Sequence, residues 1–108
     1  EYAGIEAGQT VIDLGSGAGN DVFVVRAIVG DTGRVIGLDM VSDMVEKAKA
    51  NAAKLGHENV EFHLGEIEDM PLDGGIADVL VSNCVLNLVP DKKAAFAEIH
   101  RVLKPGGR

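Results

Sequence analysis

Cysteine, tryptophan and basic residues are scarce in this chain of 108 residues, and each scarcity excludes a class of protein. A single cysteine cannot form an internal disulfide. Lysine and arginine total 10 against 17 acidic residues, and the resulting net charge of −7 argues against nucleic acid as a partner. One tyrosine, three phenylalanines and no tryptophan are too few for a platform on which bases could stack.

The sequence also lacks a long apolar run, a signal-like N-terminus, internal repeats and low-complexity segments. It therefore predicts a cytoplasmic protein that does not associate with membranes. With 46% hydrophobic and 25% charged residues, the chain has the composition of a globular protein, and its length allows one domain at most.

A glycine-rich stretch stands between an apolar run and a helical pattern near the N-terminus. Residues 11–14 are apolar apart from Asp13, and Gly15, Gly17 and Gly19 follow at alternate positions. This order predicts a buried strand, a tight loop and a helix. Glycines in such a loop let backbone N–H groups approach a ligand where a Cβ would intrude, and the helix N-terminus adds partial positive charge.

Apolar and turn patterns predict strands that alternate with helices along the whole chain. The strands are expected at 10–14, 34–39, 60–64 and 76–83, and the helices at 20–29, 42–55 and from 90–91 to 103. This alternation predicts an α/β fold with a doubly wound parallel sheet in strand order 3-2-1-4, and a ligand at the carboxyl ends of strands one and four. Because a fifth strand is expected next, residues 1–108 are predicted to be a partial domain that lacks its C-terminal strands.

Caps and buried faces are predicted for the helices as well. Ser42 is expected to cap the second helix and Gly56 to end it. The first helix is apolar on nearly all sides and should be covered on more than one face. The inner faces of the other two helices are expected to carry Val45, Ala48, Ala52 and Leu55, and Ala95, Phe96, Ile99, Val102 and Leu103.

The run that starts at Asp13 has the form D-x-G-x-G-x-G and resembles the first motif of class I S-adenosylmethionine-dependent methyltransferases. In that family the loop packs against the methionine part of the cofactor. The resemblance implies cofactor contacts for Asp13, Gly15, Ser16, Gly17 and Gly19.

An acid, Asp39, ends the second predicted strand, twenty residues after Gly19. A carboxylate there can accept both hydroxyl hydrogens of a ribose. NAD carries the same ribose, so an NAD-binding half-domain is an alternative. A dinucleotide fingerprint would have glycine where Asn20 stands, which argues against NAD.

The segment after the third predicted strand, G-E-I-E-D-M-P-L from Gly65, looks like the methyltransferase pattern G-D-A-x-x-L-P. In that family the acid accepts a hydrogen bond from the adenine amino group, and the next backbone N–H meets a ring nitrogen. These roles carry over to Glu66 and Ile67, and Met40 would pack on the adenine face. Glutamate replaces the commoner aspartate, and a solvated acidic turn is the alternative interpretation.

The run S-N-C-V-L-N-L-V-P-D-K at 82–92 resembles the corresponding segment of arsenite methyltransferases, and V-L-K-P-G-G at 102–107 is shared by many methyltransferases. The resemblance implies that Cys84 is a catalytic thiolate ligand of trivalent arsenic, beside a cofactor contact at Asn83. The chemistry fits, because soft As(III) prefers thiolates, which leave its lone pair free to attack a sulfonium methyl group. A lone cysteine is otherwise more often a small buried apolar residue.

The sequence as a whole predicts S-adenosylmethionine-dependent methyl transfer to arsenite or a thiol–arsenic conjugate in a longer parent enzyme. The arsenite family uses two further cysteines, which this chain lacks, so the chain by itself is expected to bind cofactor without methylating arsenite. Self-association through the exposed edge of the fourth strand is also expected. The alternatives are a methyltransferase for another small molecule, an NAD-binding half-domain, and a non-catalytic self-associating domain.

Overall fold

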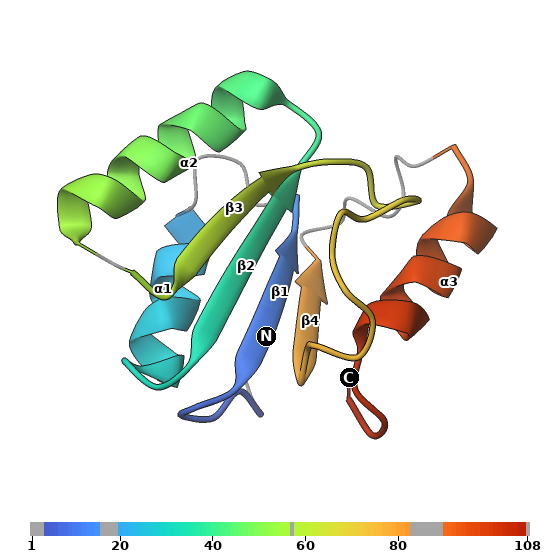
Figure 1. The fold of residues 1–108 in the computed structure, drawn as a ribbon, viewed down its shortest axis with the longest axis horizontal. Coiled ribbons are helices and arrows are strands. Elements are labelled where there is room, and N and C mark those ends of the chain that lie inside the picture. Colours follow the sequence, from blue (N-terminus) through green and yellow to red (C-terminus); the bar gives the residue numbers. More distant parts are fainter. Residues whose placement is uncertain (1–3, 16–19, 57, 83–89, 108) are drawn as a thin grey trace.

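The computed structural model is a parallel sheet with helices on both faces (Figure 1). It describes residues 4–15, 20–56, 58–82 and 90–107. The strands are β1 (Thr10–Leu14), β2 (Arg34–Asp39), β3 (Val60–Leu64) and β4 (Val79–Ser82). The helices are α1 (Asn20–Val29), α2 (Ser42–Leu55) and α3 (Lys92–Val102). The strand order β3-β2-β1-β4, with every neighbouring pair parallel, confirms the predicted α/β fold and topology.

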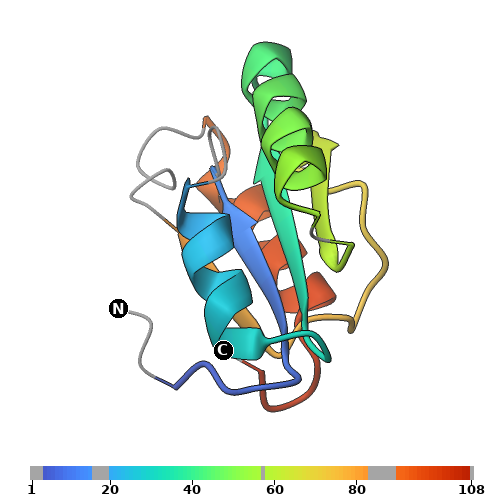
Figure 2. The same cartoon turned by 90° about the vertical axis from the view of Figure 1, so that its left-hand side faces the viewer.

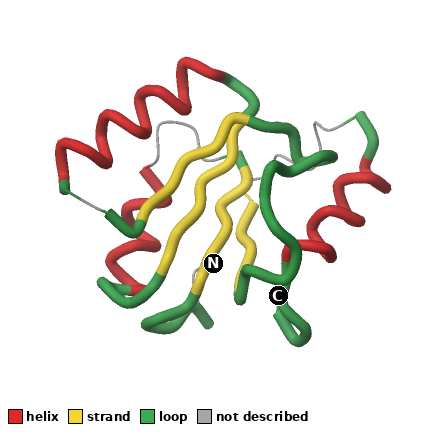
Figure 3. Tube along the Cα trace, viewed as in Figure 1, coloured by secondary structure: helices red, strands yellow, loops and turns green. Residues whose placement is uncertain are grey.

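Two hydrophobic clusters fill the two faces of the sheet, because successive strand residues point to opposite sides. On one face, Val11 and Val35 pack with α1 and α2, and on the other, Ile12 and Ile36 pack with α3. Figure 2 shows α1 and α3 on opposite sides of the sheet. The long loop between β3 and β4, green in Figure 3, contributes Ile67 to the cluster on the α3 side.

Helix α1 is fully buried along one face, whereas coverage on more than one face was predicted. Val22, Val25 and Val29 are fully buried, whereas the side chain of Val24 is 49% exposed. The spacing of the buried residues is that of one helical face, and the sheet covers only that face. The prediction of more extensive coverage is therefore wrong at Val24.

Helix α2 begins and ends differently from the sequence prediction in two details. Its N-cap is Val41, with no side-chain cap, so Ser42 is the first helical residue. The carboxylate of Asp39 accepts the Val41 N–H at 2.9 Å and takes over the turn before the helix. Gly56 ends the helix with φ +74° as predicted, but Leu55 is 57% exposed and not part of the buried stripe.

Strand β4 starts at Val79, three residues later than predicted. The N–H groups of Ile76 and Ala77 donate to the carbonyl of Val102, at 2.9 and 3.0 Å, so the end of α3 takes the place of a strand neighbour. On α3 itself Phe96 is 57% exposed and Ala95 is fully buried, which corrects the predicted inner face at Phe96.

None of the helices in the described ranges combines the length and apolar character that crossing a lipid bilayer requires. The sheet, as described, has β3 and β4 at its edges, and self-association through β4 stays a prediction.

Asp78 joins the starts of β1 and β4 to the C-terminal segment. Its Oδ2 accepts the Thr10 N–H at 2.8 Å, its own N–H donates to the Thr10 carbonyl at 2.8 Å, and Lys104 Nζ lies 3.3 Å from both carboxylate oxygens. The hydrogen bond from Thr10, followed by the contact with Lys104, lowers the pKa of Asp78 below its ordinary value against the opposing effect of desolvation.

The stabilisation by Asp78 should therefore depend on pH. Because its pKa is lower in the folded protein, the stabilisation is present above the unfolded pKa, about 4, and is lost as the pH falls through the folded pKa. Asp78→Asn should reduce the free energy of unfolding by about 1 kcal/mol near neutral pH, and the difference should shrink below about pH 4. Urea unfolding of both proteins at several pH values measures this, and a difference that does not change with pH would contradict it.

Val24 and Val25 offer a matched pair on α1, because they are adjacent and differ in burial. Val25→Ala should lower the free energy of unfolding by about 1–3 kcal/mol, since it leaves a cavity against the sheet. Val24→Ala should change it by less than about 0.5 kcal/mol. Both variants gain the same helix propensity, so equal effects in urea unfolding would show that the burial assignment is wrong.

Candidate functional site

The residues predicted to bind a cofactor follow β1, β2 and β3, whose carboxyl ends share one edge of the sheet. Leu14 pairs with Leu38, and Asp39 pairs with Leu64. The ladder continues beyond the strands, because the Gly15 N–H donates to the Leu38 carbonyl at 2.8 Å. The Gly65 N–H likewise donates to the Asp39 carbonyl at 3.0 Å. The structure thus brings the loop after β1, the acid at the end of β2 and the loop after β3 to one edge.

Gly15 turns the chain away from β1 into the glycine-rich loop. Its φ of +71° lies in the left-handed region, where a side chain would strain the backbone. The predicted contacts at Ser16, Gly17 and Gly19 lie outside the described residues, as do those at Asn83 and Cys84. Their roles stay predictions.

Asp13 is completely buried, the only charged residue in the described part of the chain with that burial. It pairs with Gly37 of β2 on one side and with Val81 of β4 on the other. A carboxylate in such a place is expensive to desolvate, so a purely structural strand would favour an apolar residue there. Its position directly before the glycine-rich loop is compatible with the predicted role in the cofactor site, which stays a prediction.

Apolar side chains are exposed beside the acid at the end of β2. Asp39 is half-buried, whereas Met40, Val41 and Leu64 are 53%, 48% and 53% exposed. A carboxylate at this place can accept a hydrogen bond from a sugar hydroxyl, while the exposed apolar groups beside it can cover the face of a base. The exposure of Met40 is compatible with its predicted contact to adenine.

The segment from Gly65 to Leu72 folds back on itself at the same edge. A Cβ on Gly65 would lie 2.8 Å from Cδ of Pro71, so the start of the loop packs directly against its end. The Asp69 N–H donates to the Glu66 carbonyl at 3.2 Å. Ile67 is buried in the core, and the Glu66 side chain is exposed. A solvated acidic turn remains an alternative for Glu66.

Two residues of α3 contact this loop and were not predicted from the sequence. Glu98 and Arg101 bind each other and the loop backbone at Met70 and Leu72. The hydrogen bond from Arg101 is the largest effect on the pKa of Glu98 and lowers it. Desolvation opposes this effect, and the bond from the Met70 N–H adds to it. An acid and a base at i and i+3 are common on exposed helices, so the sequence held only a weak signal for this contact.

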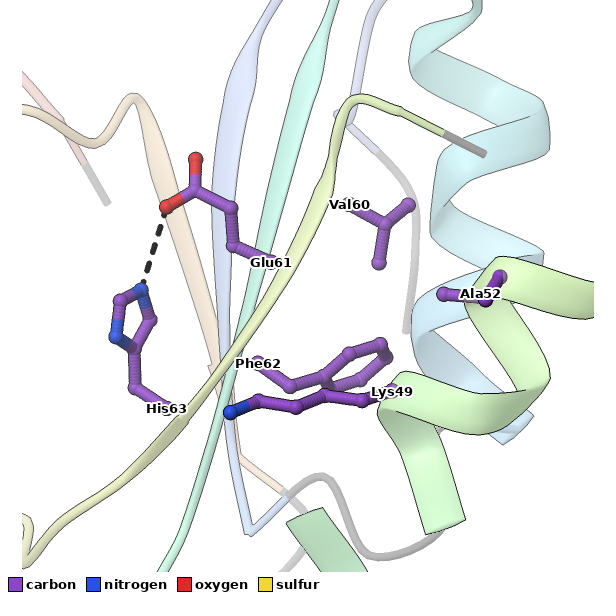
Figure 4. Close-up of a pocket in the computed structure, with 7 residues that line it drawn as sticks. Lys49, Ala52, Val60, Glu61, Phe62 and His63 are labelled. Carbon is purple, nitrogen blue, oxygen red and sulfur yellow. Dashed lines mark hydrogen bonds and ion pairs between the residues drawn. The ribbon is translucent and has the colours of Figure 1, made fainter. Parts of the chain in front are cut away.

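A pocket of about 410 Å³ lies between α2 and β3, away from the predicted site (Figure 4). Figure 4 shows the Lys49 stem beside the ring of Phe62, and a dashed line between Glu61 and His63. The Glu61 carboxylate lies 3.2 Å from Nε2 of His63. Arg34 binds the same carboxylate and lowers the pKa of Glu61. None of the predicted site residues lines this pocket. Within the described ranges, no group of three or more His, Cys, Asp or Glu residues could hold a metal ion.

Comparisons with known proteins agree with the arrangement at the carboxyl edge. A family model described as a methyltransferase domain matches residues 5–108. An arsenite methyltransferase of Halobacterium salinarum is 50% identical over 107 residues, which cover 99% of this chain and 27% of that protein.

Solved structures agree as well. An arsenic(III) S-adenosylmethionine methyltransferase from Chlamydomonas reinhardtii superposes with a TM-score of 0.86 at 43% identity, over 97% of this chain and 38% of that one. A methyltransferase from Aquifex aeolicus, described as dependent on S-adenosylmethionine, superposes with a TM-score of 0.89 at 31% identity, over 94% of this chain and 54% of that one.

The chain spans only 27–31% of the length of three arsenite methyltransferases to which it is 44–50% identical. The NAD-binding alternative is not favoured, because the family model and these relatives are all methyltransferases. The match to the family model covers nearly the whole chain and both loops that form the candidate site. The chain therefore belongs to the family of proteins built on this methyltransferase domain.

Proposed function

We propose that this chain binds S-adenosylmethionine at the carboxyl ends of its strands and is the cofactor-binding part of an enzyme that methylates trivalent arsenic. The observation that carries the proposal is the Asp39 carboxylate beside exposed Met40 and Leu64, at the edge where Gly15 turns into the glycine-rich loop. The arsenite methyltransferases at up to 50% identity support the choice of reaction.

Each part of the cofactor has a matching group at this edge. Asp39 accepts hydrogen bonds from the ribose hydroxyls, a charge-assisted contact. The adenine packs on Met40, with Glu66 at its amino group and the Ile67 N–H at a ring nitrogen. The methionine part lies over the loop of residues 15–19. When bound, the cofactor supplies a methyl group on a positively charged sulfur.

The acceptor is proposed from the run at 82–92. Cys84 would hold As(III) as a thiolate ligand and leave the arsenic lone pair free. The bound cofactor would supply the methyl group, and its transfer to that lone pair would leave the electron pair of the carbon–sulfur bond on sulfur, as S-adenosylhomocysteine and methylated arsenic. The chain's contribution is to hold donor and acceptor in line, because effective concentration and alignment lower the barrier.

Another small-molecule acceptor remains the second candidate, since the loops after β1, β2 and β3 bind only the donor. The resemblance of residues 82–92 to arsenite methyltransferases favours arsenic over other acceptors. Cys84 in this run suits a thiophilic acceptor, because soft As(III) prefers thiolate ligands.

Asp39→Ala should weaken S-adenosylhomocysteine binding by about 1–3 kcal/mol, because a charge-assisted contact to the ribose is lost. Isothermal titration calorimetry measures the change. Asp31→Ala removes the same charge from an exposed turn near the opposite edge and is the matched control. Unchanged affinity in Asp39→Ala, or equal weakening in both variants, would contradict the ribose contact.

Cys84→Ser should abolish arsenite methylation by the full-length protein and leave S-adenosylhomocysteine affinity within about twofold of the original. Serine keeps the shape of cysteine, but its hydroxyl is a hard ligand that does not ionise near neutral pH. Methylated arsenic is measured by chromatography with elemental detection. Full turnover in Cys84→Ser would refute the arsenic ligand, and equal loss of cofactor binding would point to misfolding instead.

A further inference from the structure

The loop after β3 is bound to α3 through its backbone at three points. Glu98 Oε1 accepts the Met70 N–H at 2.7 Å. Arg101 donates from Nη2 to the Met70 carbonyl at 3.1 Å and from Nη1 to the Leu72 carbonyl at 2.8 Å. Both polar backbone groups of Met70 are therefore satisfied by two side chains nearly thirty residues later in the chain.

Glu98 and Arg101 also orient each other. Arg101 donates from Nε to Glu98 Oε2 at 2.6 Å and from Nη2 to Oε1 at 2.9 Å. This two-point contact between a planar guanidinium and a carboxylate restricts both side chains. The carboxylate is thereby aimed at one backbone N–H and the guanidinium at two carbonyls.

A plain surface ion pair would not have this geometry. The Glu98 side chain is only 16% exposed, and isolated exposed pairs at i and i+3 contribute little to stability. Here the pair replaces the hydrogen bonds that a neighbouring strand or helix would give the loop. Its energetic role is therefore tied to the conformation of the loop more than to that of α3.

The constraint at Met70 reaches the tip of the loop. Met70 and Ile67 are both buried in the core, and Gly65 packs against Pro71. The tip between these points contains the Asp69 N–H bond to the Glu66 carbonyl. With its beginning, middle and end all held, the loop has little freedom to move Glu66.

We propose that Glu98 and Arg101 are positioning residues, which hold the loop after β3 so that Glu66 and the Ile67 N–H meet the edge of the adenine. This inference rests on the proposed function, because it assigns the two residues to the same cofactor site. It predicts that the Glu98–Arg101 pair controls recognition of the base rather than only the stability of the domain.

The test compares S-adenosylhomocysteine with S-inosylhomocysteine, in which oxygen replaces the adenine amino group. The original chain should bind the adenine ligand at least about tenfold more tightly, because Glu66 loses a hydrogen-bond donor in the inosine ligand. Glu66→Ala should reduce this preference to within about threefold. This variant therefore gives the change in preference to expect when the contact to the base is lost.

Arg101→Lys is the main variant, because the three donors on one ammonium nitrogen cannot reproduce the four hydrogen bonds that the guanidinium makes from three nitrogens. Arg101→Lys should reduce the preference for the adenine ligand to within about threefold. Both affinities are measured well below the melting temperature of this variant. Glu98→Gln, which keeps the size of the side chain, should act in the same direction. Glu61→Gln is the matched control, since it breaks an arginine–carboxylate pair that makes no bond to the backbone of residues 65–72, and it should keep the preference.

The outcomes separate the two proposals. Failure of the original chain to bind S-adenosylhomocysteine would refute the proposed function, whereas binding without a preference for adenine would overturn the positioning role alone. A full preference in folded Arg101→Lys and Glu98→Gln would also overturn it. Hydrogen exchange in the original chain gives a test that needs no variant, because a rapidly exchanging Met70 amide would contradict the bond to Glu98.

Discussion

The candidate site depends on the pairing of β1 between β2 and β4. Parallel ladders place the carboxyl ends of neighbouring strands side by side, so segments far apart in the sequence emerge at one edge. Gly15 and Gly65 extend this pairing past the strands through their N–H groups. Residues 11–14 of β1 are fully buried, which makes the register costly to shift.

The loop after β3 illustrates how a segment without a helix or strand can still be well ordered. Its side chains Ile67 and Met70 pack in the core, and its backbone is bound by Glu98 and Arg101. A loop held in this way has lost conformational entropy before any ligand arrives. Preorganisation of this kind increases affinity, because less ordering remains for the binding step.

Several features could not be predicted from the sequence, because they depend on spatial neighbours that periodicity does not identify. Leu55 and Phe96 continue apolar helical patterns, yet both are more than half exposed, because no element in the described part of the chain covers them. Ser42 is no cap because it is already the first residue of α2, with Val41 as the N-cap residue. Glu98 and Arg101 look like an ordinary helix pair until the loop backbone lies beside them.

The sequence by itself determined the strand and helix order, and with it the parallel topology, because apolar runs, glycines and caps are local signals. It also determined which loops carry the candidate cofactor residues, since the glycine pattern and the strand-terminal acid Asp39 stand at recognisable places. Only the tertiary structure decided the exposure of Met40 and the backbone contacts of Glu98 and Arg101. Those properties arise where segments distant in the sequence pack against each other, and the whole core sets how closely those segments approach.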